Sequence, residues 1–224
     1  GMHPTGSSRT RGVWGGGKNS SGHVNSIRYV TIATTGNSTD FGDLTIASAL
    51  GGGLSNSTRG LTIGGQGDSG SNTRIDYITI ASTGDATDFG DPSAASEEPA
   101  GLSSSTRGVY SNTGSSSTNS GTVIEYVTIG STGDATDFGD LTVGRGNMMG
   151  AMSSGVRGVF AGGTTGSASN VMDYITIAST GDATDFGDLT SARNDTTGTG
   201  SSTRGVVMGG GGAVSETDII DYIT

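Results

Sequence analysis

Residues 75–91 read Ile-Asp-Tyr-Ile-Thr-Ile-Ala-Ser-Thr-Gly-Asp-Ala-Thr-Asp-Phe-Gly-Asp, and nearly the same wording returns at 27–43, 124–140 and 173–188. Its opening returns once more at 219–224. The tyrosine of this segment recurs at steps of 48, 49, 48 and 48 residues. A unit of this length is typical of the blades of a propeller and longer than most solenoid repeats. The five tyrosines are Tyr29, Tyr77, Tyr126, Tyr174 and Tyr222.

The start of this segment places apolar side chains on both faces of a strand. Successive side chains of a strand point to opposite faces, so Ile75 and Tyr77 lie on one face and Ile78 and Ile80 on the other. A sheet with one face in water alternates apolar and polar residues, whereas a sheet covered on both faces does not. Helices are disfavoured because Gly makes up 43 of the 224 residues. The pattern therefore predicts small sheets packed between neighbours, as in propeller blades.

Each unit has room for four short strands. A small, glycine-rich strand comes first, a second follows an Arg-Gly pair, the third carries the tyrosine, and the fourth carries Asp-Phe-Gly-Asp. Between the third and fourth strands, Thr-Gly-Asp-Ala at 83–86 has the chemistry of a tight turn, and Asn37 replaces the aspartate in the first unit. This exchange assigns Asp85, Asp134 and Asp182 a role in the turn.

These strands predict an all-β fold, a five-bladed β-propeller formed as a single domain by residues 1–224. The units run at about 1–45, 46–93, 94–142, 143–190 and 191–224. The fifth unit stops at the match of Thr176, so its last blade is expected to lack the outer strand. On this basis the chain is expected to be a fragment of a longer repeat array.

Composition limits both the core and the partners. Only 30% of residues are hydrophobic and 5% aromatic, which favours many thin apolar layers over one thick core. The net charge of −10 argues against nucleic acid or an anionic membrane surface as a partner. No apolar run approaches the ~18 residues that predict a membrane helix. The absence of cysteine excludes disulfides and thiolate ligands, and we predict no cofactor and no metal.

Two repeated motifs invite a functional interpretation and have a structural one. Asp-Phe-Gly-Asp at 88–91 lacks the spacing of a calcium loop, so Phe89 is expected to pack between blades while the aspartates accept hydrogen bonds from backbone or arginine groups. The repeated arginine is expected to pair with an aspartate, although a ring of arginines that binds an anion stays open as an alternative. These arginines are Arg11, Arg59, Arg107, Arg157 and Arg204.

The fourth unit contains, in order, Val-Phe-Ala-Gly-Gly at 159–163, an Asp-Tyr pair at 173–174, Phe186, and Leu-Thr-Ser-Ala-Arg at 189–193. This order resembles the kelch repeat of galactose-oxidase-type propellers, and the resemblance covers essentially the whole chain. Phenylalanine stands where that family has tryptophan, Asn-Thr at 112–113 replaces the Gly pair of unit three, and Asp-Pro-Ser at 91–93 interrupts unit two. The Asp-Phe-Gly-Asp-Leu-Thr motif is also similar to repeats in marine phage and environmental sequences.

The resemblance implies a binding or structural role rather than catalysis. Most kelch proteins bind partners, and the copper ligands of the family's enzymes have no counterpart here. The similarity of this motif to phage repeats implies an adhesin-like virion or surface protein, extracellular or virion-associated, with a protein or a glycan as partner. A propeller-type carbohydrate-active lyase or hydrolase is the alternative, and a structural spacer without a ligand is the third possibility.

The segments that differ most between units are the loops after the Gly pair and the links between units. Their Ser, Thr, Gly and Asn content suits adaptable hydrogen bonding, although loop drift without function explains it equally well. Binding residues of propellers are expected on loops at one end of the scaffold. These loops are expected at one end of the central channel of the propeller. The predicted ligand surface at this channel mouth consists of Glu97, Glu98, Arg145, Asn147, Arg193, Asn194 and Asp195.

Overall fold

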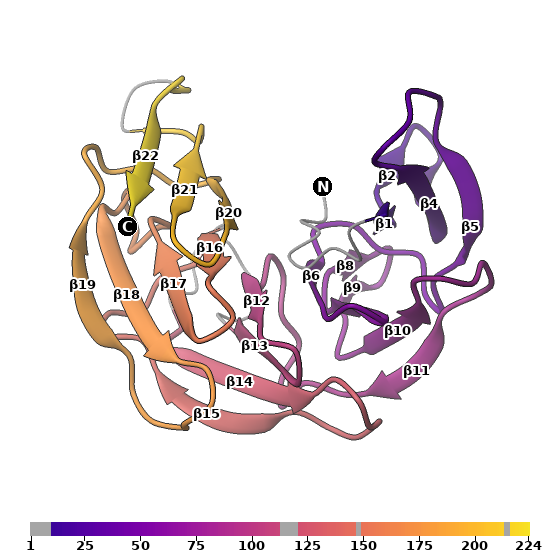
Figure 1. Ribbon diagram of the computed structural model, residues 1–224, viewed down its shortest axis with the longest axis horizontal. Helices are drawn as coiled ribbons and strands as arrows, with labels where there is room; N and C mark the ends of the chain where they lie inside the picture. The colour runs from indigo at the N-terminus through magenta and orange to yellow at the C-terminus, as the bar shows by residue number, and fades with distance from the viewer. Residues whose placement is uncertain (1–9, 113–120, 147–148, 213–215) are drawn as a thin grey trace.

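The structure of the chain, a computed structural model, describes residues 10–112, 121–146, 149–212 and 216–224. It is an all-β, five-bladed propeller built from five small antiparallel sheets (Figure 1). The blades follow one another around an arc, and blade one and blade five lie at its two ends. Blades two to four have four strands each, as predicted.

The strands of each blade follow the chain from the inner to the outer edge of the sheet. Blade two comprises β6 (Gly52–Ser55), β7 (Arg59–Ile63), β10 (Ile75–Thr79) and β11 (Thr87–Gly90). Blade three comprises β12 (Gly101–Ser103), β13 (Arg107–Ser111), β14 (Val123–Thr128) and β15 (Thr136–Asp140). Blade four comprises β16 (Gly150–Ser153), β17 (Arg157–Ala161), β18 (Val171–Thr176) and β19 (Thr184–Asp188).

The two end blades have three strands each among the described residues. Blade one comprises β1 (Arg11–Gly15), β4 (Ser26–Thr31) and β5 (Thr39–Asp43). Blade five comprises β20 (Thr197–Gly200), β21 (Gly205–Met208) and β22 (Ile220–Ile223). The outer position of blade five is therefore unfilled, which confirms the expectation of a last blade without its outer strand.

The described core consists of four apolar clusters, one at each junction between successive blades. At the junction of blades two and three, Ile75 and Phe89 pack with Tyr110 and Val127. Ile78, on the opposite face of β10, belongs instead to the cluster shared with blade one. Each blade is thus apolar on both faces, as the strand pattern predicted, and stability comes from thin layers buried between sheets.

In blades three to five, the glycine of the Arg-Gly pair makes this close packing possible. A Cβ atom on Gly108 would lie 2.4 Å from the Cδ1 atom of Leu54 in the preceding blade, so any larger residue would force that buried leucine to shift. Leu54 is 2% exposed. In these blades, the glycine after the arginine therefore marks a position where a side chain of the preceding blade packs directly against the backbone.

The five repeated arginines form no ion pair with an aspartate in the described structure, so the predicted pairing is wrong. Each guanidinium lies over the tyrosine ring of its own blade, with its Cζ atom 4.3–4.7 Å from the ring centroid. Three of them also donate to a carbonyl of the next blade, as Arg59 does to Ile129 at 3.1 Å. A tyrosine ring, a backbone carbonyl and a carboxylate all attract a guanidinium, and the sequence alone does not show which of the three an arginine will contact.

The turn aspartates join neighbouring blades. Asp134 Oδ1 accepts a hydrogen bond from the backbone N–H of Asp91 in the preceding blade at 3.0 Å. In the same place, the N–H of Gly133 donates to the Phe89 carbonyl and the N–H of Ala135 donates to the Asp91 carbonyl. We call these three bonds the outer latch, which also forms between blades one and two and between blades three and four. The side chains predicted to serve the turn therefore serve the adjacent blade.

Candidate functional site

The loops after the Gly pairs and the links between blades meet at one end of the propeller. Backbone hydrogen bonds join them in pairs: Ala49 N–H donates to the Gln66 carbonyl at 2.8 Å, and Asn194 N–H donates to the Gly211 carbonyl at 2.9 Å. The N–H of Gly146 and the carbonyl of Thr164 form the equivalent bond in blade four. These segments form one surface, which we call the loop end.

Two short hairpins extend the loop end over blades one and two. They are β2 (Lys18–Asn19) with β3 (Gly22–His23), and β8 (Gln66–Gly67) with β9 (Gly70–Ser71). The sequence pattern placed both segments in variable loops and did not predict strands there. Two-residue strands contain too few alternating positions to be recognised from a sequence.

The first hairpin is tied to the second by a histidine and an aspartate. His23 Nδ1 lies 2.5 Å from Asp68 Oδ1, and the backbone N–H of His23 donates to the same oxygen at 3.4 Å. These hydrogen bonds from His23 lower the pKa of the Asp68 carboxyl. The two residues are 45 positions apart, so only the adjacency of blades one and two brings them together.

This His–Asp pair has part of the geometry of a catalytic base. An aspartate on Nδ1 orients the imidazole and leaves Nε2 as the reactive nitrogen. Nε2 of His23 is buried and has no hydrogen-bond partner among the described residues. A nucleophile beside Nε2 is the element that a triad adds to such a pair, and no contact of this kind joins His23 to a described serine or threonine. The pair can therefore hold Nε2 of His23 in place as a proton acceptor, but it has no nucleophile beside it and so does not form a catalytic triad.

The predicted acidic residues of the loop end have local partners. Glu97 Oε1 accepts hydrogen bonds from Ser71 Oγ at 2.7 Å and from Gln66 Nε2 at 3.3 Å, which tie the link to the second hairpin. Glu98 is partly exposed, has a φ of 58°, and donates its backbone N–H to the Leu50 carbonyl. Glu97 and Glu98 thus lie at the loop end, where the sequence placed them.

The two predicted arginines lie in the interior and are not available to a ligand. Arg145 is 0% exposed and its Nη2 atom lies 2.7 Å from Asp173 Oδ2, also 0% exposed. Burial lowers the pKa of Arg145, and the charge of Asp173 opposes that effect. Arg193 makes the same contact with Asp221 at 2.6 Å. The buried arginine–aspartate pairs of the described structure are thus formed by arginines that were expected to face a ligand.

The remaining predicted residues divide in the same way. Asn194 is partly buried, and its backbone pairs with Gly211. Asp195 is exposed, with a φ of 53°, although the packing around its carboxyl raises its pKa. Asn147 lies outside the described residues. Of the seven predicted positions, Glu97, Glu98 and Asp195 present side chains at the surface of the loop end.

Blade three replaces the arginine–aspartate pair with a different buried polar contact. Ser96 occupies the link position of Arg145, and Glu125 occupies the position of Asp173. Asn112 Nδ2 donates to Glu125 Oε2 at 2.7 Å and to the Ala94 carbonyl at 3.2 Å. The departure from the Gly pair in unit three is therefore structural, because the asparagine amide supplies donors that the missing guanidinium supplies elsewhere.

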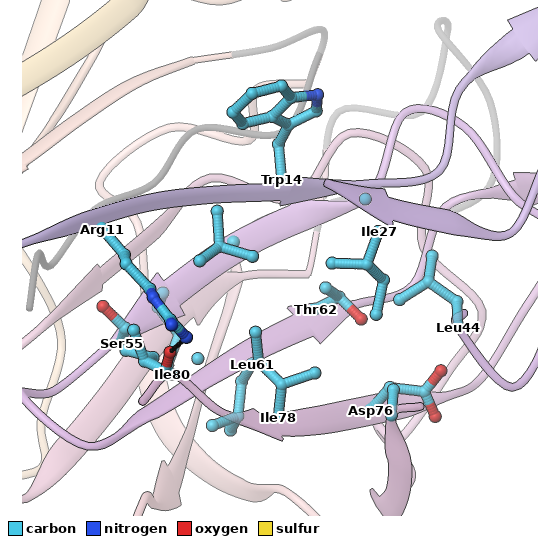
Figure 2. A pocket seen from close by; sticks show the side chains of 16 residues that line it. Arg11, Trp14, Ile27, Leu44, Ser55, Leu61, Thr62, Asp76, Ile78 and Ile80 are labelled. Carbon is cyan, nitrogen blue, oxygen red and sulfur yellow. Dashed lines mark hydrogen bonds between the residues drawn. The ribbon is translucent and has the colours of Figure 1, made fainter. Parts of the chain in front are cut away.

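Figure 2 shows a cavity between blades one and two, with Arg11 at one end and Asp76 at the other. Its volume is about 60 Å³, and its apolar lining includes Val13, Ile27, Leu44 and Leu61. Pockets for small molecules usually measure ~300 Å³ or more. The cavity is therefore a gap in the packing of this junction rather than a ligand site.

Val13→Leu is expected to raise the free energy of unfolding by about 0.5–1 kcal/mol, because the added methylene fills this gap. Leucine already occupies the matching position in blade two, at Leu61. The matched control is Val109→Leu, at a position that is 0% exposed, which is expected to destabilise by about 1–3 kcal/mol. Urea unfolding of both variants measures the difference. Stabilisation by both changes, or by neither, would contradict a gap confined to the first junction.

Asp76 provides a pH-dependent prediction. The carboxylate accepts hydrogen bonds from Thr45 but is 4% exposed, and its burial raises its pKa. Between the unfolded and the raised folded pKa, the folded state binds more protons, so lowering the pH through this window stabilises the fold. Asp76→Asn removes this titration. The difference in unfolding free energy between the natural protein and the variant is therefore expected to grow in favour of the natural protein as pH falls from 7 towards 4. A difference that is constant with pH would exclude this effect.

The described residues contain no group of three or more His, Asp or Glu side chains placed to hold a metal ion. They also contain no helix long and apolar enough to cross a membrane. No protein-family model matches the sequence, and no curated protein matches it either.

Proposed function

We propose that the chain is a non-enzymatic, kelch-like propeller module that binds a protein or a glycan through its loop end. One contrast supports this proposal. The strands, arginine–tyrosine stacks and tyrosine–phenylalanine contacts repeat almost unchanged from blade to blade. Among the described residues the loop end is less regular: blades one and two carry equivalent short hairpins of different sequence, and blade four carries an irregular loop.

The loop end also has the chemistry of a polar binding surface. Hydroxyl, amide and carboxylate groups of Ser71, Gln66 and Glu97 hold its segments together, and further exposed polar residues surround them. Such groups bind carbohydrate hydroxyls or a polar protein surface with adaptable hydrogen bonds. With a net charge of −10, the protein is expected to favour neutral or cationic partners over anionic ones. In a virion or surface adhesin, this loop end would contact the host surface.

The test is a binding screen of the whole chain against immobilised glycans and host surface proteins. We expect binding that is weakened at least ~10-fold by the double change Asp68→Ala and Glu97→Ala, which releases both hairpins without touching the blades. The matched control, Asp85→Ala with Asp134→Ala, alters two aspartates of the outer latches and is expected to leave the affinity within ~2-fold. Equal losses in both double variants would refute binding through the loop end.

A carbohydrate-active lyase or hydrolase remains the second candidate because of the His23–Asp68 pair. An oriented imidazole is a suitable base for removing a proton from a sugar ring, although Nε2 of His23 is buried and the hairpins would have to open before it could act. Turnover of a polysaccharide panel that His23→Ala abolishes, and that Asp85→Ala leaves intact, would favour the enzyme over the binding module. Binding without turnover would exclude it.

A further inference from the structure

A buried ion pair recurs beside the third strand of the later blades. In blade four, Nη2 of Arg145, from the preceding link, lies 2.7 Å from Asp173 Oδ2, and the same guanidinium donates to the Val171 carbonyl. In blade five, Arg193 and Asp221 make the same contact at 2.6 Å. Each of these two blades thus places a positive charge against the carboxylate at this position.

Blade three keeps the carboxylate and loses the arginine. Glu125, which is 1% exposed, occupies the position of Asp173. Ser96, which is 0% exposed, occupies the position of Arg145. Glu125 accepts hydrogen bonds from Asn112 Nδ2 at 2.7 Å and from a backbone N–H of the link at 3.0 Å, and both donors are neutral. No described basic side chain forms an ion pair with it, so the negative charge of Glu125 is unbalanced.

The first two blades do not share this imbalance. Blade one has Arg28 at the acidic position, so it has no carboxylate there to neutralise. In blade two, Asp76 accepts hydrogen bonds from Thr45, and the positive charge of Arg74 opposes the rise in the pKa of Asp76 that burial causes. Among the described residues, Glu125 is therefore the acidic group at this repeat position that has no positive charge beside it.

Three buried side-chain oxygens in this part of blade three have no hydrogen-bond partner among the described residues: Ser96 Oγ, Tyr110 Oη and Asn112 Oδ1. Tyr110 lies directly opposite Glu125 in the register of β13 and β14, and burial, followed by the charge of Glu125, raises the pKa of its hydroxyl. Asn112 contacts the carboxylate through its nitrogen, which leaves its oxygen unpaired. Ser96 stands where the arginine of blade four begins. The three side chains are at most 5% exposed, so bulk water does not reach these oxygens.

A backbone carbonyl in blade three lacks the same positive partner. In blade four the Val171 carbonyl accepts two hydrogen bonds, one from the N–H of Gly162 at 3.0 Å and one from the guanidinium of Arg145. The matching Val123 carbonyl accepts the N–H of Asn112 at 2.8 Å, and no guanidinium donates to it in the described structure. Since a carbonyl oxygen has two lone pairs, one of them is left for another partner.

We propose that a monovalent alkali cation, Na⁺ or K⁺, binds at Glu125 in place of the missing guanidinium. Its ligands are oxygens of Glu125, Ser96, Tyr110 and Asn112 and the Val123 carbonyl. Carboxylate, carbonyl and hydroxyl oxygens suit hard cations, and nitrogen and sulfur ligands are not among them. The revised expectation therefore replaces, at this position, the prediction of no metal that the sequence supported.

The charge of the site selects a monovalent ion. A single carboxylate is balanced by one positive charge, whereas a divalent ion would leave a net positive charge in the interior. A water molecule would satisfy the hydroxyl and amide oxygens but would leave the charge of Glu125 unbalanced. An alkali cation meets both requirements, as the arginine does in blade four.

The test is thermal unfolding of the whole chain in the chlorides of Na⁺, K⁺, Ca²⁺ and choline at one ionic strength. Screening of the surface charges is then the same in each salt, and choline is too large for a buried site. We expect Na⁺ or K⁺ to raise the unfolding midpoint by at least ~3 °C relative to choline, and the rise to saturate with concentration. Equal midpoints in all four salts, or a rise with Ca²⁺ alone, would overturn the proposal.

Two matched carboxyl variants locate the ion. Glu125→Gln removes the buried charge and is expected to abolish the difference between the alkali salts and choline. Asp137→Asn removes an exposed carboxylate from the same blade and is expected to leave that difference unchanged. Equal behaviour of the two variants would show that the cations act on the protein surface and would overturn the assignment to Glu125.

The repeat also supplies a variant that is expected to fold without the ion. The combined changes copy into blade three the side chains that blade four has at these positions, including its buried ion pair. This variant is expected to unfold at the same midpoint in the alkali salts and in choline, because the guanidinium takes the place of the cation. A difference that persists in it would overturn the proposal, even if Glu125→Gln fails to fold. The changes are Ser96→Arg, Tyr110→Phe, Asn112→Gly and Glu125→Asp.

Discussion

Arg145→Ala is expected to lower the free energy of unfolding by about 3–5 kcal/mol, because it leaves the carboxylate of Asp173 buried without its counter-charge. Both side chains are 0% exposed, so water does not replace the lost guanidinium. The guanidinium also donates to the Val171 carbonyl, and that acceptor loses its partner in the same variant. Urea or thermal unfolding followed by circular dichroism measures the loss.

Two controls separate the orphaned charge from the loss of an arginine as such. Arg157→Ala removes an exposed guanidinium that stacks on Tyr174 and is expected to cost about 1 kcal/mol or less. The double change Arg145→Met with Asp173→Leu removes both buried charges and is expected to recover most of the stability lost by Arg145→Ala. Equal destabilisation by Arg145→Ala and Arg157→Ala would show that the buried pair contributes no more to the free energy of unfolding than an exposed arginine does.

Gly139→Ala is expected to have the second largest effect, a loss of about 2–4 kcal/mol. Gly139 has a φ of 144°, and an added Cβ would lie 2.4 Å from the carbonyl oxygen of Gly181 in the next blade. The contact is between two backbones, so no flexible side chain can move aside. The substitution therefore strains the outer latch between blades three and four or breaks it.

Gly187→Ala is the matched control, because it changes the same repeat position in blade four. Gly187 also has a positive φ, of 124°, but an added Cβ atom would have no neighbour within 4 Å, since no latch forms there among the described residues. This variant is expected to lose only the conformational cost of about 1–2 kcal/mol. If the two variants are equally destabilised, the backbone conformation and not the latch explains the glycine.

The latch and the buried pair explain how a chain with few apolar residues holds a defined shape. The junction of blades three and four combines a thin apolar cluster with an outer latch between backbones and a buried arginine–aspartate pair. Because the apolar clusters and the outer latches do not involve the loops after the Gly pairs, those loops are free to differ from blade to blade. This separation is what a binding module on a repeat scaffold requires.

The candidate site was less predictable than the scaffold. The links were expected to form a surface, and Glu97, Glu98 and Asp195 do lie on it. Arg145 and Arg193 lie in the variable links and were expected on that surface, yet each has an acidic partner in the interior. The His23–Asp68 contact had no signal in the sequence other than the repeat itself, which places the two hairpins on adjacent blades.

By itself, the sequence determined the all-β class, the number of blades and the order of strands within each blade. It did so because strand alternation and turn chemistry depend on residues that are close in the sequence, and because the same pattern occurs in every repeat unit. Only the tertiary structure decided which polar groups meet across a junction. Whether an arginine finds a carboxylate, a tyrosine face or a carbonyl depends on distances between blades, and residues such as Arg59 and Arg145 have the same chemistry in the sequence and opposite environments in the fold.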